Sequence, residues 1–141
     1  MKNCKEMFVL RTNTLFFYFI AACLTFGSAA HADDLTKRTI VKRANLGQAE
    51  NMELIETVTE SQPGAVVERH SHHGLEAVYV IQGSTIQSPD GKPVQLETGA
   101  TMLNMRDVLH AGYKVIGNTS LKLFTVHVVD RNMPLYEPAP Q

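Results

Sequence analysis

From Met52 onward the sequence is a succession of short runs in which apolar and polar residues alternate, each ended by residues typical of turns. In the run MELIETVTE, residues 52–60, Leu54 and Val58 fall on one side of an extended chain and Ile55 falls on the other. No window repeats its apolar residues with the period of a helix. About seven to nine such runs, roughly ten residues apart, predict an all-β sandwich or barrel.

The chain after its first 32 residues divides into three segments. Residues 33–51 are polar and mixed, with Thr39–Val41 as a candidate for a short edge strand. Residues 52–130 hold the regular runs, including a hairpin around Pro89-Asp90-Gly91. Residues 131–141 form a proline-rich tail, and we expect no central strand there because proline cannot donate a ladder hydrogen bond.

Residues 1–32 have the features of an export signal. Three basic residues precede an uncharged apolar run, residues 15–26, which is too short to cross a bilayer as a helix. Ala30-His31-Ala32 has the small-x-small form that signal peptidases cleave. We therefore expect cleavage between Ala32 and Asp33, no integral membrane span in the mature chain, and a periplasmic or secreted bacterial protein.

An alternative processing site lies within the apolar run. Ile20-Ala21-Ala22-Cys23 resembles a bacterial lipobox, which would leave a lipoprotein anchored at Cys23. The apolar run continues past Cys23 through Phe26, and this continuation favours cleavage at Ala32 instead.

Composition narrows the classes of partner. Cleavage after Ala32 would leave 109 of the 141 residues and would remove both cysteines, so the mature chain could offer neither a disulfide nor a thiolate metal ligand. The net charge of the whole chain is −1, which argues against nucleic acid as a partner. A core of this size is small, so a homodimer stays open beside a monomer.

The segment RHSHHGLE, residues 69–76, holds three of the six histidines of the chain. We expect one strand over residues 65–72, with one face formed by Val66, Glu68, His70 and His72. Two imidazoles about 7 Å apart on one face can converge on a single ion. His73 points to the other face and is expected at the rim. For the whole segment, the alternative interpretation is an exposed loop that happens to be rich in histidine.

Glu76 changes the balance between these interpretations. It opens the next predicted strand and shares its face with Val78 and Val80, so its carboxylate points toward the same interior. A carboxylate in a β core is costly unless it is paired or coordinates a cation. The pattern therefore favours a metal site.

Two motifs in the chain resemble those of the cupins, a superfamily of small β-barrels. Gly64-x5-His70-x-His72-x3-Glu76-x6-Gly83 matches the first cupin motif at every position. The second motif is Gly-x5-Pro-x-Gly-x2-His-x3-Asn, and the chain departs from it at three positions that shape a turn. Its glycine and histidine are Gly99 and His110, while proline, glycine and asparagine are replaced by Met105, Asp107 and Lys114.

The resemblance covers residues 52–129 and implies a double-stranded β-helix, or jelly-roll, barrel. It also implies that one divalent transition metal is bound by His70, His72, Glu76 and His110. Such a nitrogen and oxygen donor set suits Fe, Mn, Ni, Co or Zn, and the sequence does not choose among them. Four protein ligands leave two positions of an octahedral ion open for water, substrate or O₂, whereas structural zinc sites are usually closed.

Three further residues are candidates for the second shell or the pocket. His127 alternates with apolar residues in a strand, so it is either a core histidine with a hydrogen-bond partner or a support for the metal ligands. Met105, near the second motif, is expected to line the cavity and contact a ligand. Tyr79 is a candidate for the pocket, although packing is its favoured role. The sequence offers no clear catalytic nucleophile or acid–base pair.

The open site favours a metal-dependent enzyme that acts on a small molecule, and the resemblance to cupins suggests dioxygenase-like chemistry. The alternative is a non-catalytic module that holds a metal or small ligand, which the small size and the absence of a recognisable lid support. A structural barrel without metal is the third possibility.

Overall fold

A computed structural model describes residues 35–140, and these residues form eleven strands and no α-helix. None of the described residues therefore belongs to a helix that could cross a membrane. The expected signal segment, its cleavage site and Cys23 lie outside the described residues. The strands are β1 (Thr36–Asn45), β2 (Met52–Ser61), β3 (Val66–Val67), β4 (His70–Ser71), β5 (Gly74–Gln82), β6 (Ser84–Gln87), β7 (Val94–Leu96), β8 (Thr101–Asn104), β9 (Tyr113–Val115), β10 (Leu121–Asp130) and β11 (Glu137–Pro138).

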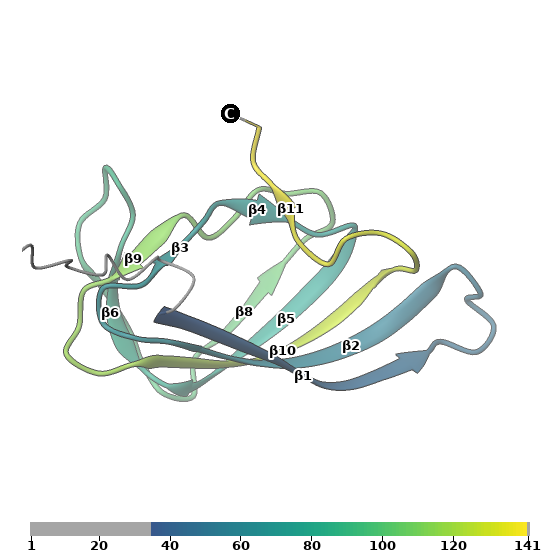
Figure 1. Cartoon of the computed structure of the whole chain (residues 1–141), viewed down its shortest axis with the longest axis horizontal. Coiled ribbons are helices and arrows are strands. Elements are labelled where there is room, and N and C mark those ends of the chain that lie inside the picture. Colours follow the sequence, from purple (N-terminus) through teal and green to yellow (C-terminus); the bar gives the residue numbers. More distant parts are fainter. Residues whose placement is uncertain (1–34, 141) are drawn as a thin grey trace, which may run out of the picture.

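The strands form two main antiparallel sheets and one short pair. The larger sheet has the order β1-β2-β10-β5-β8, the smaller has the order β3-β9-β6-β7, and β11 pairs with β4. In Figure 1 the long strands β1, β2 and β10 run along one side of the molecule, while β3, β4 and β11 lie across from them. The expectation of an all-β, two-sheet barrel is confirmed.

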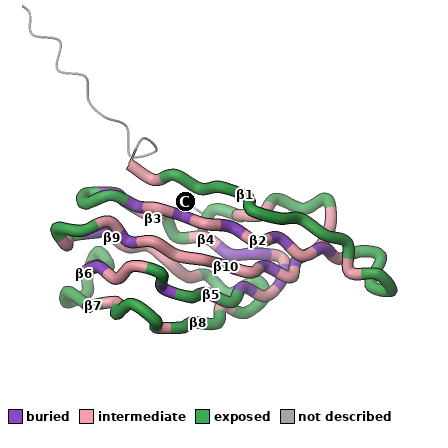
Figure 2. The backbone as a smooth tube through the Cα atoms, turned by 90° about the horizontal axis from the view of Figure 1, so that it is seen from below, coloured by how far each residue is buried: buried purple, intermediate pink, exposed green. Residues whose placement is uncertain are grey.

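Alternation along the long strands sets the interior face. In β2 every second residue is buried, and the buried set includes Ile55, Thr57 and Thr59 rather than Leu54 and Val58. Figure 2 shows the same alternation of buried and less buried positions along the larger sheet, while β1 at its edge is mostly exposed. The interior that β2 faces is therefore partly polar.

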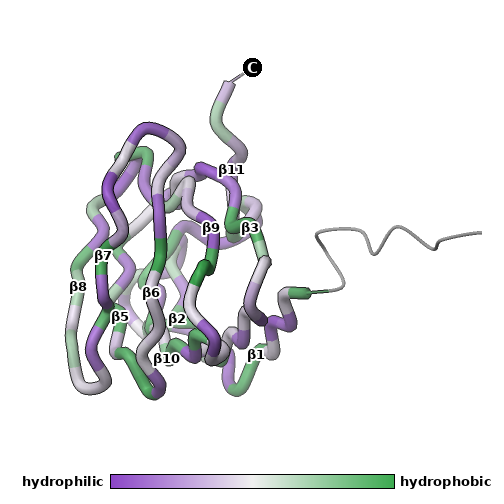
Figure 3. The backbone as a smooth tube through the Cα atoms, turned by 90° about the vertical axis from the view of Figure 1, so that its left-hand side faces the viewer, coloured by the Kyte–Doolittle hydropathy of each residue, from purple (hydrophilic) through white to green (hydrophobic). Residues whose placement is uncertain are grey.

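The main apolar cluster lies at one end of the barrel, while Ile55, Val78 and Val129 are buried outside it. Its buried members are Ala65, Val80, Val115 and Leu121, and partly buried apolar side chains such as Ile86 pack against them. Figure 3 shows that hydrophobic and hydrophilic positions alternate along the strands around this interior. The remaining interior space is free to hold polar side chains.

The expected strand over residues 65–72 is interrupted. Val66–Val67 pairs with β9, whereas His70–Ser71 pairs with β11, so Glu68 and Arg69 lie between two short strands with different partners. This break shifts the face: Val67 lines the central cavity with His70, while Val66 is 39% exposed. The expectation that Val66 and Glu68 share the interior face of His70 is therefore wrong.

Both ends of the described chain join the barrel. The strand β1 is longer than the three-residue edge strand expected at Thr39–Val41, and it pairs with β2 along almost its whole length. The C-terminal tail forms no central strand, but its two-residue strand β11 pairs with β4 beside the histidines. The amide of Ala139 also donates to the carbonyl of Arg69.

The two glycines of the first motif, Gly64 and Gly83, are required for different physical reasons. Gly64 adopts φ of 91°, a left-handed conformation that glycine reaches without steric cost. Gly83 lies so close to the backbone of Leu96 that a Cβ atom would overlap its carbonyl oxygen. The turn between β5 and β6 therefore depends on the absence of a side chain at Gly83.

We expect Gly83→Ala to lower the free energy of unfolding by about 1–3 kcal/mol, because the added methyl group overlaps backbone that cannot move without disturbing β7. Urea denaturation measures the change. Gly91→Ala is the control, since a Cβ there would lie no closer than 3.3 Å to any atom of Ser88, in an exposed turn. It should change the free energy by less than about 0.5 kcal/mol. Equal midpoints for the two variants would contradict the close-approach argument.

Candidate metal centre

Four segments bring imidazoles and a carboxylate to one point in the barrel. His70 lies in β4, His72 follows it, Glu76 lies in β5, and His110 lies in the connection between β8 and β9. An isolated bridge joins His70 to His110, because each backbone amide donates to the carbonyl of the other, at 3.1 and 2.9 Å. The backbone therefore holds two of the predicted ligands next to each other.

The side-chain atoms have the spacing of ligands around a single ion. The Nε2 atoms of His72 and His110 lie 3.1 Å apart, and they lie 3.2 and 3.3 Å from Oε2 of Glu76. Ligand atoms about 2.1 Å from a metal are separated by about 3.0 Å at right angles and about 3.4 Å in a tetrahedron. The ligand nitrogens of His70, His72 and His110 all lie within 4.8 Å of one another.

Backbone carbonyls determine which ring nitrogen carries the proton. Nδ1 of His70 donates to the carbonyl of Glu68 at 2.8 Å, and Nδ1 of His110 donates to that of Val108 at 2.9 Å. Nδ1 of His72 donates to the carbonyl of Leu135. Because a carbonyl oxygen can only accept, each Nδ1 holds its hydrogen, and in the neutral ring each Nε2 presents a lone pair. The donor set therefore fits a metal ion.

Glu76 supplies the negative charge. Its residue is 6% exposed, and burial alone would raise its pKa. Contacts with His110 and His72, together with a hydrogen bond of 2.7 Å from Asn104, outweigh burial and hold the pKa below its usual range. The carboxylate is therefore ionised, and it needs a positive charge beside it.

The pKa values of His70 and His110 shift in opposite directions. Burial lowers the pKa of His70 to about 4, so this imidazole is neutral and able to bind a metal near pH 7. Burial also lowers the pKa of His110, but the contact with Glu76 outweighs it and the net shift is upward. A positive charge, either a proton or a metal ion, is thus favoured between His110 and Glu76.

His127 adds a fourth imidazole to the site. It lies in β10 directly across from Glu76, it is fully buried, and its Nε2 lies 3.7 Å from Oε1 of the carboxylate. Nε2 also lies 2.8 Å from the hydroxyl of Thr125. His72, Glu76 and His127 form a second group with metal-binding spacing. Burial lowers the pKa of His127 to about 4, so the ring is neutral.

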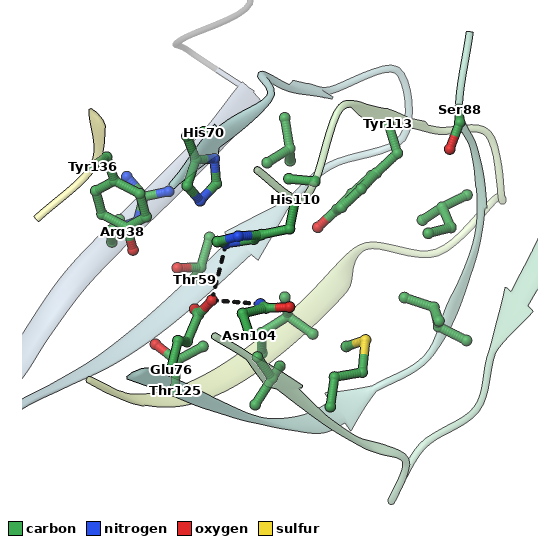
Figure 4. A pocket seen from close by; sticks show the side chains of 17 residues that line it. Arg38, Thr59, His70, Glu76, Ser88, Asn104, His110, Tyr113, Thr125 and Tyr136 are labelled. Atoms are coloured by element: carbon green, nitrogen blue, oxygen red, sulfur yellow. Dashed lines mark hydrogen bonds and ion pairs between the residues drawn. The ribbon is translucent and has the colours of Figure 1, made fainter. Parts of the chain in front are cut away.

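The centre opens into a cavity of about 230 Å³ with a polar and an apolar part. Figure 4 shows His70, His110, Glu76 and Asn104 gathered at one side of it, with Tyr113 and Ser88 further along the wall. The apolar part of the lining consists of Val67, Val78, Ile86, Leu96, Met102 and Leu123. A pocket of this size suits a small molecule.

The sequence also matches the family model of the cupin domain over residues 57–127, half of the chain. The chain belongs to the cupin family. The double-stranded β-helix fold expected from the two motifs is confirmed. None of the curated proteins compared with this cupin matches its sequence.

Solved structures support the same fold. The polyketide cyclase RemF from Streptomyces resistomycificus has 17% identity, with 76% of this cupin and 72% of that chain covered and a TM-score of 0.55. A conserved protein with a double-stranded β-helix domain from Klebsiella pneumoniae has 19% identity, coverages of 81% and 98%, and a TM-score of 0.53. A predicted oxalate decarboxylase from Thermotoga maritima has 19% identity, coverages of 67% and 80%, and a TM-score of 0.50. At these identities the likeness concerns the fold alone.

The second cupin motif keeps its turn despite its substitutions. Asp107 stands at the position of the motif glycine and adopts φ of 59°, a conformation that aspartate tolerates better than most residues. Its amide donates to the carbonyl of His72, and its carboxylate lies 3.0 Å from Nδ1 of His73. His73 therefore lies at the rim, pointing away from the metal centre.

Two expected pocket residues lie elsewhere in this cupin. Tyr79 is 47% exposed on the outer face of β5, because alternation places it opposite Glu76 and Val78. Met105 is 53% exposed in the turn after β8 and does not line the cavity, whereas Met102 does. Tyr113 also lines the cavity, and burial raises its pKa to about 12.

Sequence reasoning missed three residues of the site. Asn104 faces Glu76 across β8 and β5, and alternation from Met102 could have identified it. Tyr136 reaches the site from the tail, with its ring centroid 4.9 Å from those of His70 and His72. Arg38 reaches it from β1, outside the matched residues. Neither Arg38 nor Tyr136 belongs to a motif that could have indicated its position.

The tail contributes to the candidate metal centre, because the carbonyl of Leu135 orients the ring of His72. We expect a chain that ends at Pro134 to bind Zn(II) about 10–100-fold more weakly than the full chain, since it loses this hydrogen bond and the Tyr136 ring. Competition with a chromogenic chelator measures the affinity, and circular dichroism checks the fold.

A chain that ends at Pro138 is the control for this truncation, because it keeps Leu135, Tyr136 and β11. It should retain nearly all of the affinity. Equal affinities for the two shortened chains would show that the tail does not orient His72.

Proposed function

We propose that this cupin binds one divalent transition metal through His70, His72, Glu76 and His110 and acts as a metal-dependent enzyme, with dioxygenase-like chemistry, on a small molecule. The observation that carries the proposal is that three histidines, each oriented by a backbone carbonyl, direct their Nε2 atoms to the same point as a buried, ionised carboxylate. The metal is Fe, Mn, Ni, Co or Zn, since each accepts this donor set.

The residues around the donor set support catalysis more than storage. Four protein ligands leave open positions on an octahedral ion, and these positions would face a cavity with an apolar wall. A metal bound there can polarise a substrate oxygen, acidify a bound water or bind O₂.

The chain itself holds the reacting groups in place. Asn104 fixes one oxygen of Glu76, and His127 lies against the other, so the carboxylate keeps one orientation. The hydroxyl of Thr125 lies 2.7 Å from that of Thr57 and holds His127 in turn. The apolar wall excludes water from the body of a bound substrate, which strengthens electrostatic interactions at the metal.

The expected export signal extends the proposal to location. Removal of residues 1–32 would release the enzyme into the periplasm or the medium, where it would acquire its metal after export. A lipoprotein anchored at Cys23 would carry the same site at a membrane surface.

We expect untagged protein to contain about one transition metal ion per chain by elemental mass spectrometry, and His110→Ala to lose most of it because a ligand is removed. His73→Ala is the matched control: it removes a neighbouring histidine that faces Asp107 and should leave the metal content unchanged. Metal-free protein, even after reconstitution with Fe(II), Mn(II), Ni(II) and Zn(II), would exclude the metalloenzyme.

Turnover separates an enzyme from a binding module. With Fe(II) bound, we expect at least one compound from a panel of catechols, small thiols and small organic acids to drive O₂ consumption that His110→Ala abolishes. Isotopically labelled O₂ should place both oxygen atoms in the product. A compound that raises the melting temperature and is recovered unchanged, without O₂ consumption, would instead indicate a binding module.

A further inference from the structure

Arg38 is a cation at the mouth of the cavity that the cupin motifs do not account for. It lies in β1, outside residues 57–127, and pairs in register with Thr59, whose side chain also lines the cavity. Among the described residues that line this cavity, it is the single lysine or arginine. It also lines the groove on the outer side of β3, so it stands at the boundary between cavity and solvent.

The guanidinium of Arg38 is held in place by an aromatic face. Its Cζ lies 3.7 Å from the ring centroid of Tyr136, a distance typical of a strong cation–π contact. The same ring packs edge-on against His70 and His72, with centroids 4.9 Å apart. Tyr136 thus fixes the guanidinium beside the candidate metal centre, as Figure 4 shows.

Within residues 35–140 the guanidinium makes no ion pair or hydrogen bond with a side chain, although it presents five N–H donors. The carboxylate of Glu76 is already engaged by Asn104 and by the two histidines nearest to it. Since residues 35–140 supply no side-chain acceptor, the guanidinium is available to a ligand in the cavity.

The chemistry of the cavity indicates the kind of acceptor. A planar guanidinium matches a carboxylate with two parallel hydrogen bonds, and a divalent metal beside it would add positive charge. The far part of the cavity is apolar, and the total volume is about 230 Å³. A ligand that satisfies both parts has a carboxylate head and a short apolar body.

We propose that the substrate of this cupin is a small organic acid whose carboxylate is bound by Arg38 on its Tyr136 platform, with its apolar body directed along Val78, Ile86 and Leu123. This inference rests on the proposed function, because it names the substrate class of the same site.

Isothermal titration of hexanoate and hexan-1-ol into Zn(II)-loaded protein tests the proposal, since the two probes share an apolar chain and differ in the carboxylate. We expect Arg38→Gln to weaken hexanoate binding about 10–100-fold and to leave hexan-1-ol unchanged, because a charge-assisted pair is lost. Tyr136→Ala should also weaken hexanoate, because the platform is removed. Lys42→Gln, a loss of the same charge from an exposed position of β1, should have no effect.

Two results would overturn the proposal. One is equal hexanoate affinity in Arg38→Gln and the unmodified protein; the other is tighter, Arg38-dependent binding of inorganic phosphate. Metal content measured on the same samples keeps this test apart from that of the proposed function. If the unmodified protein retains no metal, the function fails, and the same titrations on the metal-free protein still decide whether Arg38 binds carboxylates.

Discussion

The buried, ionised carboxylate of Glu76 is the constraint that organises this barrel. An isolated charge at 6% exposure would destabilise the fold by several kcal/mol. Asn104, His72 and His110 surround it, and polar side chains of β2 and β10 face it, so this part of the interior cannot pack as an apolar core. The apolar cluster around Val80 and Val115 therefore occupies the other end. The buried charge of Glu76 thus accounts for the polar side chains at its end of the interior.

Backbone carbonyls orient the histidine rings at the polar end of the interior. The three carbonyls that accept from His70, His72 and His110 belong to separate segments, and one of them lies in the C-terminal tail. Because each fixes a ring orientation as well as a tautomer, the Nε2 atoms converge before any ion arrives. Such preorganisation would lower the cost of ordering the ligands of a bound metal, and it makes the geometry of the site depend on the folding of the whole barrel.

Patterns within short segments of the sequence correctly predicted the interior face of β5 and the fold. Alternation placed Glu76, Val78 and Val80 on one face, and the spacing of glycines and histidines identified the cupin fold. The break at Glu68 and Arg69 was not predicted, because it arises from pairing with two different partners, β9 and β11, that lie far away in the sequence. Met105 was expected to line the pocket because it lies near the second motif, but it follows the end of β8 and is exposed. Tyr79 was only a candidate for the pocket, and strand alternation directs it outward.

The residues that the motifs identified differ in their expected role from those that the motifs missed. The motif residues identified from the sequence form a cluster that could hold a metal ion, and such a cluster by itself would not select a substrate. Arg38 and Tyr136, which no motif identified, reach the same cavity from the two ends of the described chain. If recognition depends on such contacts, a cupin can change its ligand by altering its terminal segments while Glu76 and its histidines stay in place. On the proposal made above, the strands that flank the motif-bearing core would then decide which substrate the site accepts.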